Sequence, residues 1–228
     1  MVFDNIKYRD AQQIKLAVDC IIFGFNDNRL EVLLIHRGFQ PEMGTWSLIG
    51  GFIDNDEDLD EAANRVLYGL SGLKNIYMEQ VRTFGKADRD SSGRVVSTVY
   101  SAMILKSEYD EALVQKYNAQ WFPIDDLPKL VFDHADMVDS AIKRLRRRVR
   151  NYPIAFNLLP SKFTLPQLQA LYEGILNEPI DKRNFRRKVM QMNYLVKLNE
   201  KDMSVSRKGA YFYQFDEALY KKEQNFNL

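Results

Sequence analysis

The chain has a single cysteine, Cys20, and no long hydrophobic run. One cysteine cannot form a disulfide within the chain, and it cannot supply the ligands of a cysteine-based zinc site. No apolar stretch approaches the roughly 20 residues that a membrane-spanning helix needs. The first ten residues, MVFDNIKYRD, are polar and lack the apolar core of a signal peptide. These absences predict a cytoplasmic protein that does not enter a membrane.

The chain also lacks an overall charge bias, because 32 Lys and Arg residues are offset by 31 Asp and Glu residues. The charge is nevertheless unevenly distributed. Residues 151–228 contain 12 Lys and Arg against 8 Asp and Glu, whereas residues 1–150 contain 20 against 23. A basic excess at the carboxyl-terminal end favours a surface there for an anionic partner such as nucleic acid.

Strand and helix signals alternate in the first 150 residues, which predicts an α/β domain. Asn26-Asp27-Asn28 is a turn signal between two apolar runs, so a β-hairpin is expected near the start. A helix over residues 134–149 should present one apolar face. The runs that predict strands are residues 14–25, 30–36, 76–88 and 94–105.

The stretch from Gly50 to Leu73 indicates a loop that runs into an amphipathic helix. The paired glycines allow the backbone to turn where a side chain would clash. Asp54, Asn55 or Asp56 is expected to cap the helix, and the acidic residues that follow suit the positive end of its dipole. The helix should end around Gly72.

This stretch resembles the Nudix box, G-x5-E-x7-R-E-U-x-E-E-x-G-U, in which U is a bulky aliphatic residue. Val66, Gly69 and Leu70 replace the three central glutamates, which hold magnesium in the hydrolases that the resemblance points to. Magnesium needs oxygen ligands, which these side chains lack. The resemblance therefore implies a Nudix fold kept for binding, without catalytic residues, metal or cofactor. Six fixed positions of the box match: Gly51, Glu57, Arg65, Leu67, Gly72 and Leu73.

The segment FGKADRDSSGRVVS, residues 84–97, also resembles Nudix proteins, especially those linked to ADP-ribose. Cationic side chains would suit a pyrophosphate, whereas acids and an aromatic face would suit a sugar. Trp46 has an equally good alternative as a core aromatic, and Arg65 is expected to pair with an acid of its own helix such as Glu61. The residues predicted to bind an effector are Asp19, Arg37, Trp46, Gly50, Gly51, Phe52, Lys86, Asp88 and Arg89.

The helix over residues 134–149 ends in a dense basic cluster. Cations suit the negative end of a helix dipole, but six of them in eight residues exceed that need. The cluster therefore has two interpretations, a solvated helix end or a surface that contacts phosphate. The cluster consists of Lys143, Arg144, Arg146, Arg147, Arg148 and Arg150.

Residues 151–228 predict a second domain after the break at Asn151-Tyr152-Pro153. Thr164-Leu165-Pro166-Gln167 resembles a capping box that opens a helix. Asp181 is expected to cap a basic helix that runs to about Met192. Two strands, residues 194–198 and 210–215, should follow around a polar turn.

This order of helix, turn, basic helix and β-hairpin is typical of a winged helix-turn-helix domain. A recognition helix needs one apolar face for packing and one donor-rich face for the major groove of DNA. The predicted DNA-binding residues are Lys182, Arg183, Asn184, Arg186, Arg187, Lys188, Gln191, Lys201, Arg207 and Lys208.

A Nudix-like α/β/α sandwich over residues 1–150 joined to this winged helix-turn-helix resembles the Nudix-related transcriptional regulators. The stretch from Leu158 to Lys188 is close to their carboxyl-terminal signature. Of their branches, the NrtR type represses NAD-biosynthesis genes and responds to ADP-ribose, and the AraR type of Bacteroidetes responds to L-arabinose. The segments AVDCIIFGF and WSLIGGF look more like the second branch.

The resemblance implies a homodimeric repressor that an effector releases from near-palindromic operator DNA. L-arabinose is favoured as that effector, with ADP-ribose as the alternative. Two other classes stay open. One is an active Nudix pyrophosphohydrolase with ligands recruited from elsewhere in the chain, and the other is a protein-interaction module that does not bind DNA.

Overall fold

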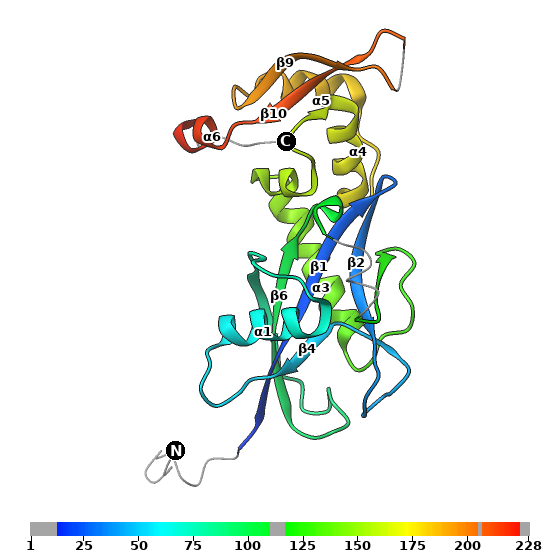
Figure 1. Ribbon diagram of the computed structural model, residues 1–228, viewed down its shortest axis with the longest axis vertical. Coiled ribbons are helices and arrows are strands. Elements are labelled where there is room, and N and C mark those ends of the chain that lie inside the picture. Colours follow the sequence, from blue (N-terminus) through cyan, green and yellow to red (C-terminus); the bar gives the residue numbers. More distant parts are fainter. Residues whose placement is uncertain (1–12, 110–116, 205–206, 224–228) are drawn as a thin grey trace, which may run out of the picture.

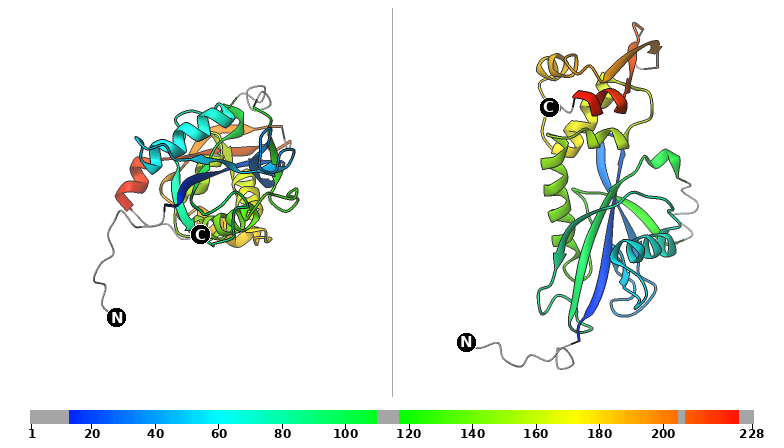
Figure 2. Two further views of the ribbon diagram at one scale, coloured as in Figure 1. Left: turned by 90° about the horizontal axis from the view of Figure 1, so that it is seen from below. Right: turned by 90° about the vertical axis from the view of Figure 1, so that its left-hand side faces the viewer.

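The computed structural model describes residues 13–109, 117–204 and 207–223. The chain forms two domains stacked along its long axis, with helix α3 extending from the lower domain toward the upper one (Figures 1 and 2). No helix in the described ranges is both long and apolar enough to cross a membrane.

The lower domain is built on a seven-stranded sheet. Its main path runs β3-β2-β1-β6-β5, with β4 paired to β1 and β7 paired to β2. The central pair β1 and β6 is parallel, and the other pairs are antiparallel. The strands are β1 (Lys15–Asn26), β2 (Arg29–His36), β3 (Trp46–Ser47), β4 (Ile49–Phe52), β5 (Glu79–Phe84), β6 (Val95–Met103) and β7 (Ala119–Pro123).

Helices α1 (Leu59–Ser71) and α3 (His134–Val149) cover opposite faces of this sheet (Figure 2). Successive side chains of a strand point to opposite faces. Cys20 and Ile22 of β1 therefore pack in the cluster that includes α1, whereas Ile21 and Phe23 pack in the cluster that includes α3. The predicted α/β/α sandwich is confirmed, and both faces of β1 are buried.

Helix α1 begins later than the sequence indicated. Its cap is Asp58, whose side chain accepts from the backbone N–H groups of Asp60 and Glu61. The Asp58 N–H in turn donates to the Glu61 carboxylate. The prediction of Asp54, Asn55 or Asp56 was wrong, because α1 begins only at Leu59. Asp54 has a glutamate at the same spacing, and its N–H donates to Glu57 at 2.8 Å, but only the Asp58 carboxylate also accepts from the first N–H groups of the helix. Gly72 ends the helix at φ 73°, as expected.

The upper domain has a helical core and a three-stranded sheet in the order β8-β10-β9. Thr164 caps α4 through the expected capping box with Gln167. The basic helix ends at Val189 rather than near Met192, and the strand predicted to end at residue 198 continues to Asp202. The remaining described elements are η2 (Lys106–Glu108), which follows β6, and those after α3: η3 (Pro153–Leu158), β8 (Phe163–Thr164), α4 (Leu165–Leu176), α5 (Lys182–Val189), β9 (Leu195–Asp202), β10 (Ala210–Phe215) and α6 (Glu217–Glu223).

The two domains share one hydrophobic cluster, which runs from the sheet through α3 and η3 to α4 and α5. The turn between β1 and β2 lies against α4 at Gly174. A Cβ atom on Gly174 would lie 2.6 Å from Cε2 of Phe25 and 2.7 Å from the carbonyl oxygen of Asn28. The backbones therefore approach closely only because this position has no side chain.

Replacing Gly174 by alanine is expected to destabilise the contact between the domains, because either the turn or α4 must move. Overpacking of this kind costs about 1–3 kcal/mol. Denaturant unfolding measures the change. The matched control is Gly69→Ala in α1, where nothing lies within 4 Å of an added Cβ. That variant should be more stable by about 0.5–1 kcal/mol, because alanine favours a helix interior. Equal stability of Gly174→Ala and the wild-type chain would contradict the close approach.

Candidate functional site

The main candidate site is a cleft of about 600 Å³ in the lower domain, bordered by α1, β1, β4 and the loops that follow β2, join β5 to β6 and precede α3. Val66, Gly69 and Leu70, the residues at the glutamate positions of the Nudix box, line it. Among the described residues, no group of three or more His, Cys, Asp or Glu side chains is arranged to hold a metal ion. The wall where Nudix hydrolases hold magnesium is apolar in this chain.

Arg65 lines the cleft, but its guanidinium is held by an internal partner. It donates to the Glu57 carboxylate, with 2.7 Å from Nε to Oε2, and to the carbonyl oxygen of Phe52 at 2.9 Å. The bond from Arg65 is the main reason that the pKa of Glu57 falls to about 2. Arg65 was expected to pair with an acid such as Glu61, and it does pair within the chain, but with Glu57. The Glu61 carboxylate is used in the capping box of α1.

The floor of the cleft is a network of buried charged and polar side chains centred on Asp19. Ser97 donates to Asp19 Oδ2 at 2.5 Å, and His134 Nε2 lies 3.6 Å from Asp19 Oδ1. Gly50 is required beside this carboxylate, because a Cβ there would lie 2.0 Å from Asp19 Oδ1. Arg89 approaches Asp19 at 3.9 Å.

His134 is neutral within this network. The backbone N–H of Leu48 donates to His134 Nδ1 at 3.0 Å, so that nitrogen carries no proton. Burial lowers the pKa of His134, and the nearby Asp19 only partly opposes that effect. The imidazole therefore accepts one backbone hydrogen bond and adds no second buried cation to the floor.

Two cations in the cleft have no carboxylate within ion-pair distance in the described part of the chain. Arg37 donates through Nε to the carbonyl oxygen of Pro41 at 3.0 Å, and its guanidinium lies 4.3 Å from the ring centre of Phe39. Burial lowers the pKa of Arg37. Lys15 lies over the Phe52 ring at 5.3 Å. Arg65 and Arg89 also line the cleft, but each is bonded to a carboxylate, of Glu57 and Asp133 respectively. Lys15 and Arg37 are therefore the cations through which the cleft can attract an anion.

The structure brings together six of the nine predicted effector residues. Asp19, Arg37, Gly50, Gly51, Phe52 and Arg89 all line the cleft. The cleft is also lined by Lys15, Phe39 and His134, which were not among the predicted residues. Lys15 is the first residue of β1 and could have been found from the strand pattern, whereas nothing in the sequence relates the positions of Phe39 and His134 to the box.

The other three predicted residues lie elsewhere. Lys86 and Asp88 line a neighbouring groove of about 640 Å³ and lie 3.6 Å apart as an exposed ion pair. Trp46 does not line the cleft. Its ring packs edge-on against His36 and Phe122, with ring centres 5.1 and 4.7 Å away, so its position favours the core alternative.

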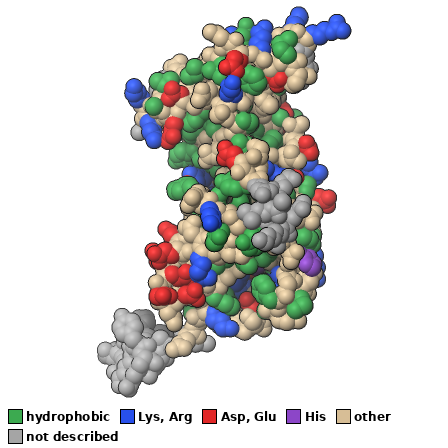
Figure 3. Space-filling model, in the orientation of Figure 1, with side chains coloured by type: hydrophobic (Ala, Val, Ile, Leu, Met, Phe, Trp, Pro, Cys, Tyr) green, Lys and Arg blue, Asp and Glu red, His purple; other side chains and the backbone are tan. Residues whose placement is uncertain are grey.

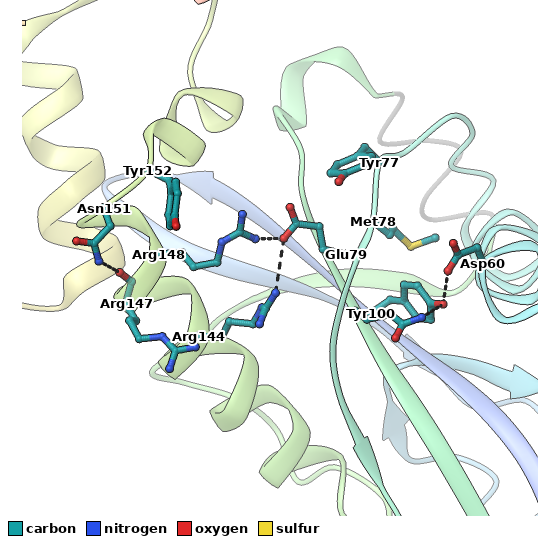
Figure 4. Close-up of a pocket in the computed structure, with 11 residues that line it drawn as sticks. Asp60, Tyr77, Met78, Glu79, Tyr100, Arg144, Arg147, Arg148, Asn151 and Tyr152 are labelled. Carbon is teal, nitrogen blue, oxygen red and sulfur yellow. Dashed lines mark hydrogen bonds and ion pairs between the residues drawn. The ribbon is translucent and has the colours of Figure 1, made fainter. Parts of the chain in front are cut away.

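The basic cluster at the end of α3 is largely paired within the chain. Arg144 and Arg148 both approach Glu79 of β5 in a groove of about 820 Å³ (Figure 4). Arg146 donates to the carbonyl oxygen of Ile175 at 2.8 Å, and Arg150 lies 2.7 Å from Glu178. These partners explain most of the cluster without phosphate, and they attach α3 both to the sheet and to the upper domain.

Helix α5 differs from α3 in how its charges are used. Phe185 and Val189 are buried against the rest of the upper domain, and Asp181 caps the helix by accepting from the Asn184 N–H at 2.8 Å. Its basic residues are exposed, and no ion pair neutralises them within the described ranges. The exposed polar residues on and just after α5 are Lys182, Arg183, Asn184, Arg186, Arg187, Lys188 and Gln191.

The hairpin of β9 and β10 extends beyond α5 in Figure 1, and Lys and Arg side chains gather at the same top end in Figure 3. Lys201 lies in β9 rather than in the predicted turn, and its Nζ is 4.6 Å from the Tyr211 ring centre. Arg207 and Lys208 are exposed beside the tip. The predicted polar residues of the helix and the hairpin thus belong to one domain and are accessible.

Comparisons with known proteins agree with both domains. Residues 13–141 match the NUDIX domain family, and residues 155–215 match the NrtR DNA-binding winged helix domain. The chain is 33% identical over 215 residues to the ADPR responsive transcriptional repressor NtrR of Acinetobacter baylyi, covering 92% of this chain and 85% of that protein. It is also 33% identical over 144 residues to an ADP-ribose pyrophosphatase of Methanocaldococcus jannaschii, covering 60% and 82%.

Solved structures show the same arrangement. NrtR of Shewanella oneidensis in complex with a 27mer DNA is similar with a TM-score of 0.80 and 32% identity, over 93% of this chain and 99% of that one. The NUDIX domain of that protein in complex with ADP ribose is similar with a TM-score of 0.52 and 33% identity, over 62% and 94%.

The fold and the comparisons define a Nudix domain joined to a winged helix domain. The chain belongs to the NrtR type of Nudix-related regulator family. The AraR branch that the sequence segments had favoured is not confirmed, since the relative that covers most of the chain is named as an ADPR responsive repressor.

The bond between Arg65 and Glu57 gives a measurable prediction. In Arg65→Gln the pKa of Glu57 should rise from about 2 toward the ordinary value near 4.3, because the largest cause of its lowering is removed. Any stability from this bond is present above the unfolded-state pKa and is lost as the pH falls through the folded-state pKa. An NMR titration of the Glu57 carboxyl group measures the shift. An unchanged pKa in Arg65→Gln would contradict this account of the loop before α1.

Proposed function

We propose that this protein is a DNA-binding transcriptional repressor whose Nudix cleft binds ADP-ribose, and that this binding weakens its hold on operator DNA. The observation that carries the proposal is the contrast between paired and unpaired cations. The arginines of α3 are largely taken by partners within the chain, whereas those of α5 are exposed and free of ion pairs in the described ranges.

Helix α5 has the composition that reading DNA requires. Arginine can donate two hydrogen bonds to guanine, and asparagine or glutamine can pair with adenine in the major groove. Arg183, Arg187 and Asn184 are the residues of α5 best suited to base contacts. The hairpin residues Lys201, Arg207 and Lys208 suit phosphates, which supply affinity rather than sequence preference. A repressor that binds chromosomal DNA acts where that DNA lies, which agrees with the cytoplasmic location expected from the sequence.

ADP-ribose fits the cleft better than L-arabinose does. Its pyrophosphate carries negative charge, and the cleft offers Lys15 and Arg37 without carboxylate partners in the described part of the chain. Phe39, Phe52 and Phe132 supply apolar surface for a ring. A pentose would leave the charge of Lys15 and Arg37 without a partner. The relatives named for ADP-ribose support the same choice, and arabinose is withdrawn as the favoured effector.

The ligand can release DNA only if it binds more tightly to an arrangement that fits the operator poorly. We propose that the protein acts as a homodimer, in which two winged helix domains occupy two half-sites of a near-palindromic operator. A ligand that prefers the wrong spacing of these domains lowers operator affinity. Coupling between sites is typically 1–3 kcal/mol, or about 5–150-fold in affinity.

The function is tested by fluorescence anisotropy with a labelled duplex taken from upstream of the chain's own gene. The wild-type chain should bind it, and the double variant Arg183→Ala/Arg187→Ala should lose sequence-specific binding because the base-reading donors are gone. The double variant Lys74→Gln/Lys143→Gln removes the same charge from exposed sites of the Nudix domain and should bind like the wild type. Specific binding that survives in the α5 variant would assign recognition to another surface.

Effector choice and catalysis are separated by two further measurements. ADP-ribose should weaken operator binding and L-arabinose should leave it unchanged, because only the first places an anion beside Lys15 and Arg37. ADP-ribose incubated with the protein and Mg²⁺ should stay intact by chromatography, because the metal-binding glutamates are replaced. Rapid magnesium-dependent hydrolysis would favour the pyrophosphohydrolase, and the absence of any DNA binding would favour an interaction module.

A further inference from the structure

Helix α3 is attached at both ends to parts of the molecule with different roles. Near its carboxyl end, Arg144 and Arg148 approach Glu79 of the sheet, and Arg146 donates to the carbonyl oxygen of Ile175 in the winged helix domain. Its amino end begins at His134 on the floor of the effector cleft. The 16 residues of α3 span roughly 24 Å at 1.5 Å per residue, so the helix connects the cleft to the upper domain.

Asp133 occupies the capping position of α3 but does not cap the helix. Its side chain makes no hydrogen bond to the first backbone N–H groups of α3. Both carboxylate oxygens instead accept from Arg89, at 2.9 Å from Nε and 2.7 Å from Nη2. An aspartate at this position normally stabilises its own helix by capping it, whereas here the carboxylate bonds to another element instead.

The pair of Arg89 and Asp133 is nearly sealed from solvent. The Arg89 side chain is 2% exposed and that of Asp133 is 15% exposed. A bidentate arginine–carboxylate bond fixes both geometry and charge. Arg89 also lines the effector cleft and approaches Asp19 on its floor. A single guanidinium is therefore shared by the cleft and by the first turn of α3.

We infer that Asp133 is a positioning residue that couples the effector cleft to the winged helix domain, an inference that rests on the proposed function. Without ligand, its bond to Arg89 holds the amino end of α3 against the cleft floor. An anionic group of the ligand competes with Asp133 for Arg89 and weakens that bond. The amino end of α3 is then held less firmly. The contacts of Arg146 with Ile175 of α4 and of Arg150 with Glu178 just after α4 carry the change to the winged helix domain.

This arrangement predicts three linked effects of Asp133→Asn. Loss of the charge favours the arrangement that the ligand also favours, so operator binding without ligand should weaken and ADP-ribose binding should tighten. The release caused by ADP-ribose should shrink, because part of the shift has already occurred. We expect about 5–150-fold release in the wild-type chain and no more than about threefold in the variant.

The matched control is Asp136→Asn, which removes the same charge from an exposed position in the first turn of the same helix. It should behave as the wild type does in all three measurements. Asparagine is itself a good helix cap, so Asp133→Asn is expected to fold. Asp133→Ser, which also supplies a capping oxygen, provides a second variant without the charge.

Operator affinity by anisotropy, with and without ADP-ribose, and ADP-ribose affinity by calorimetry together test the inference. The inference is overturned if ADP-ribose releases DNA from Asp133→Asn and Asp133→Ser as fully as it does from the wild type and from Asp136→Asn. This holds even if the two Asp133 variants are less stable. A wild-type chain that binds the operator but ignores ADP-ribose would instead contradict the proposed function. The two failures are distinguished by the wild-type measurement alone.

Discussion

The arrangement of the whole molecule depends on a hydrophobic core that is continuous across both domains. The turn between β1 and β2 contacts α4 at Gly174, and η3 contributes Ala155, Phe156 and Leu158 to the same cluster. A core of this kind does not allow the upper domain to swing freely, because any movement must repack buried side chains. The position of α5 is therefore tied to the position of α3, which begins at the cleft.

Some of the Lys and Arg side chains pair with acids within the chain, and others are available to a ligand or to DNA. Glu79, Glu178 and Asp133 each take arginines that the sequence alone would have offered to phosphate. Among the cations without a carboxylate partner in the described ranges are Lys15 and Arg37 in the cleft and the basic residues on the exposed face of α5. Burial of an ion pair is costly unless the pair is well bonded, which makes the bidentate bond between Arg89 and Asp133 noteworthy for a residue on a ligand cleft.

The sequence predicts those features that depend on local patterns. The alternation along β1, the capping box at Thr164 and the replaced glutamates of the Nudix box are all read within a few residues. Features that depend on distant residues were missed or wrong. Arg89 meets Asp133 across 44 positions, and Arg146 meets Ile175 across 29. Asp58 was missed as the cap because several neighbouring acids can each cap a helix, and only the fold selects one.

The central claim is that the cleft and the winged helix domain act as one coupled system, and reciprocity tests it most directly. Calorimetry gives the affinity of ADP-ribose for the free protein and for the protein saturated with operator DNA. Because coupling between two binding sites is mutual, ADP-ribose should bind the DNA complex more weakly by the same factor by which it weakens operator binding. Equal affinity for the free and the DNA-bound protein would contradict the account.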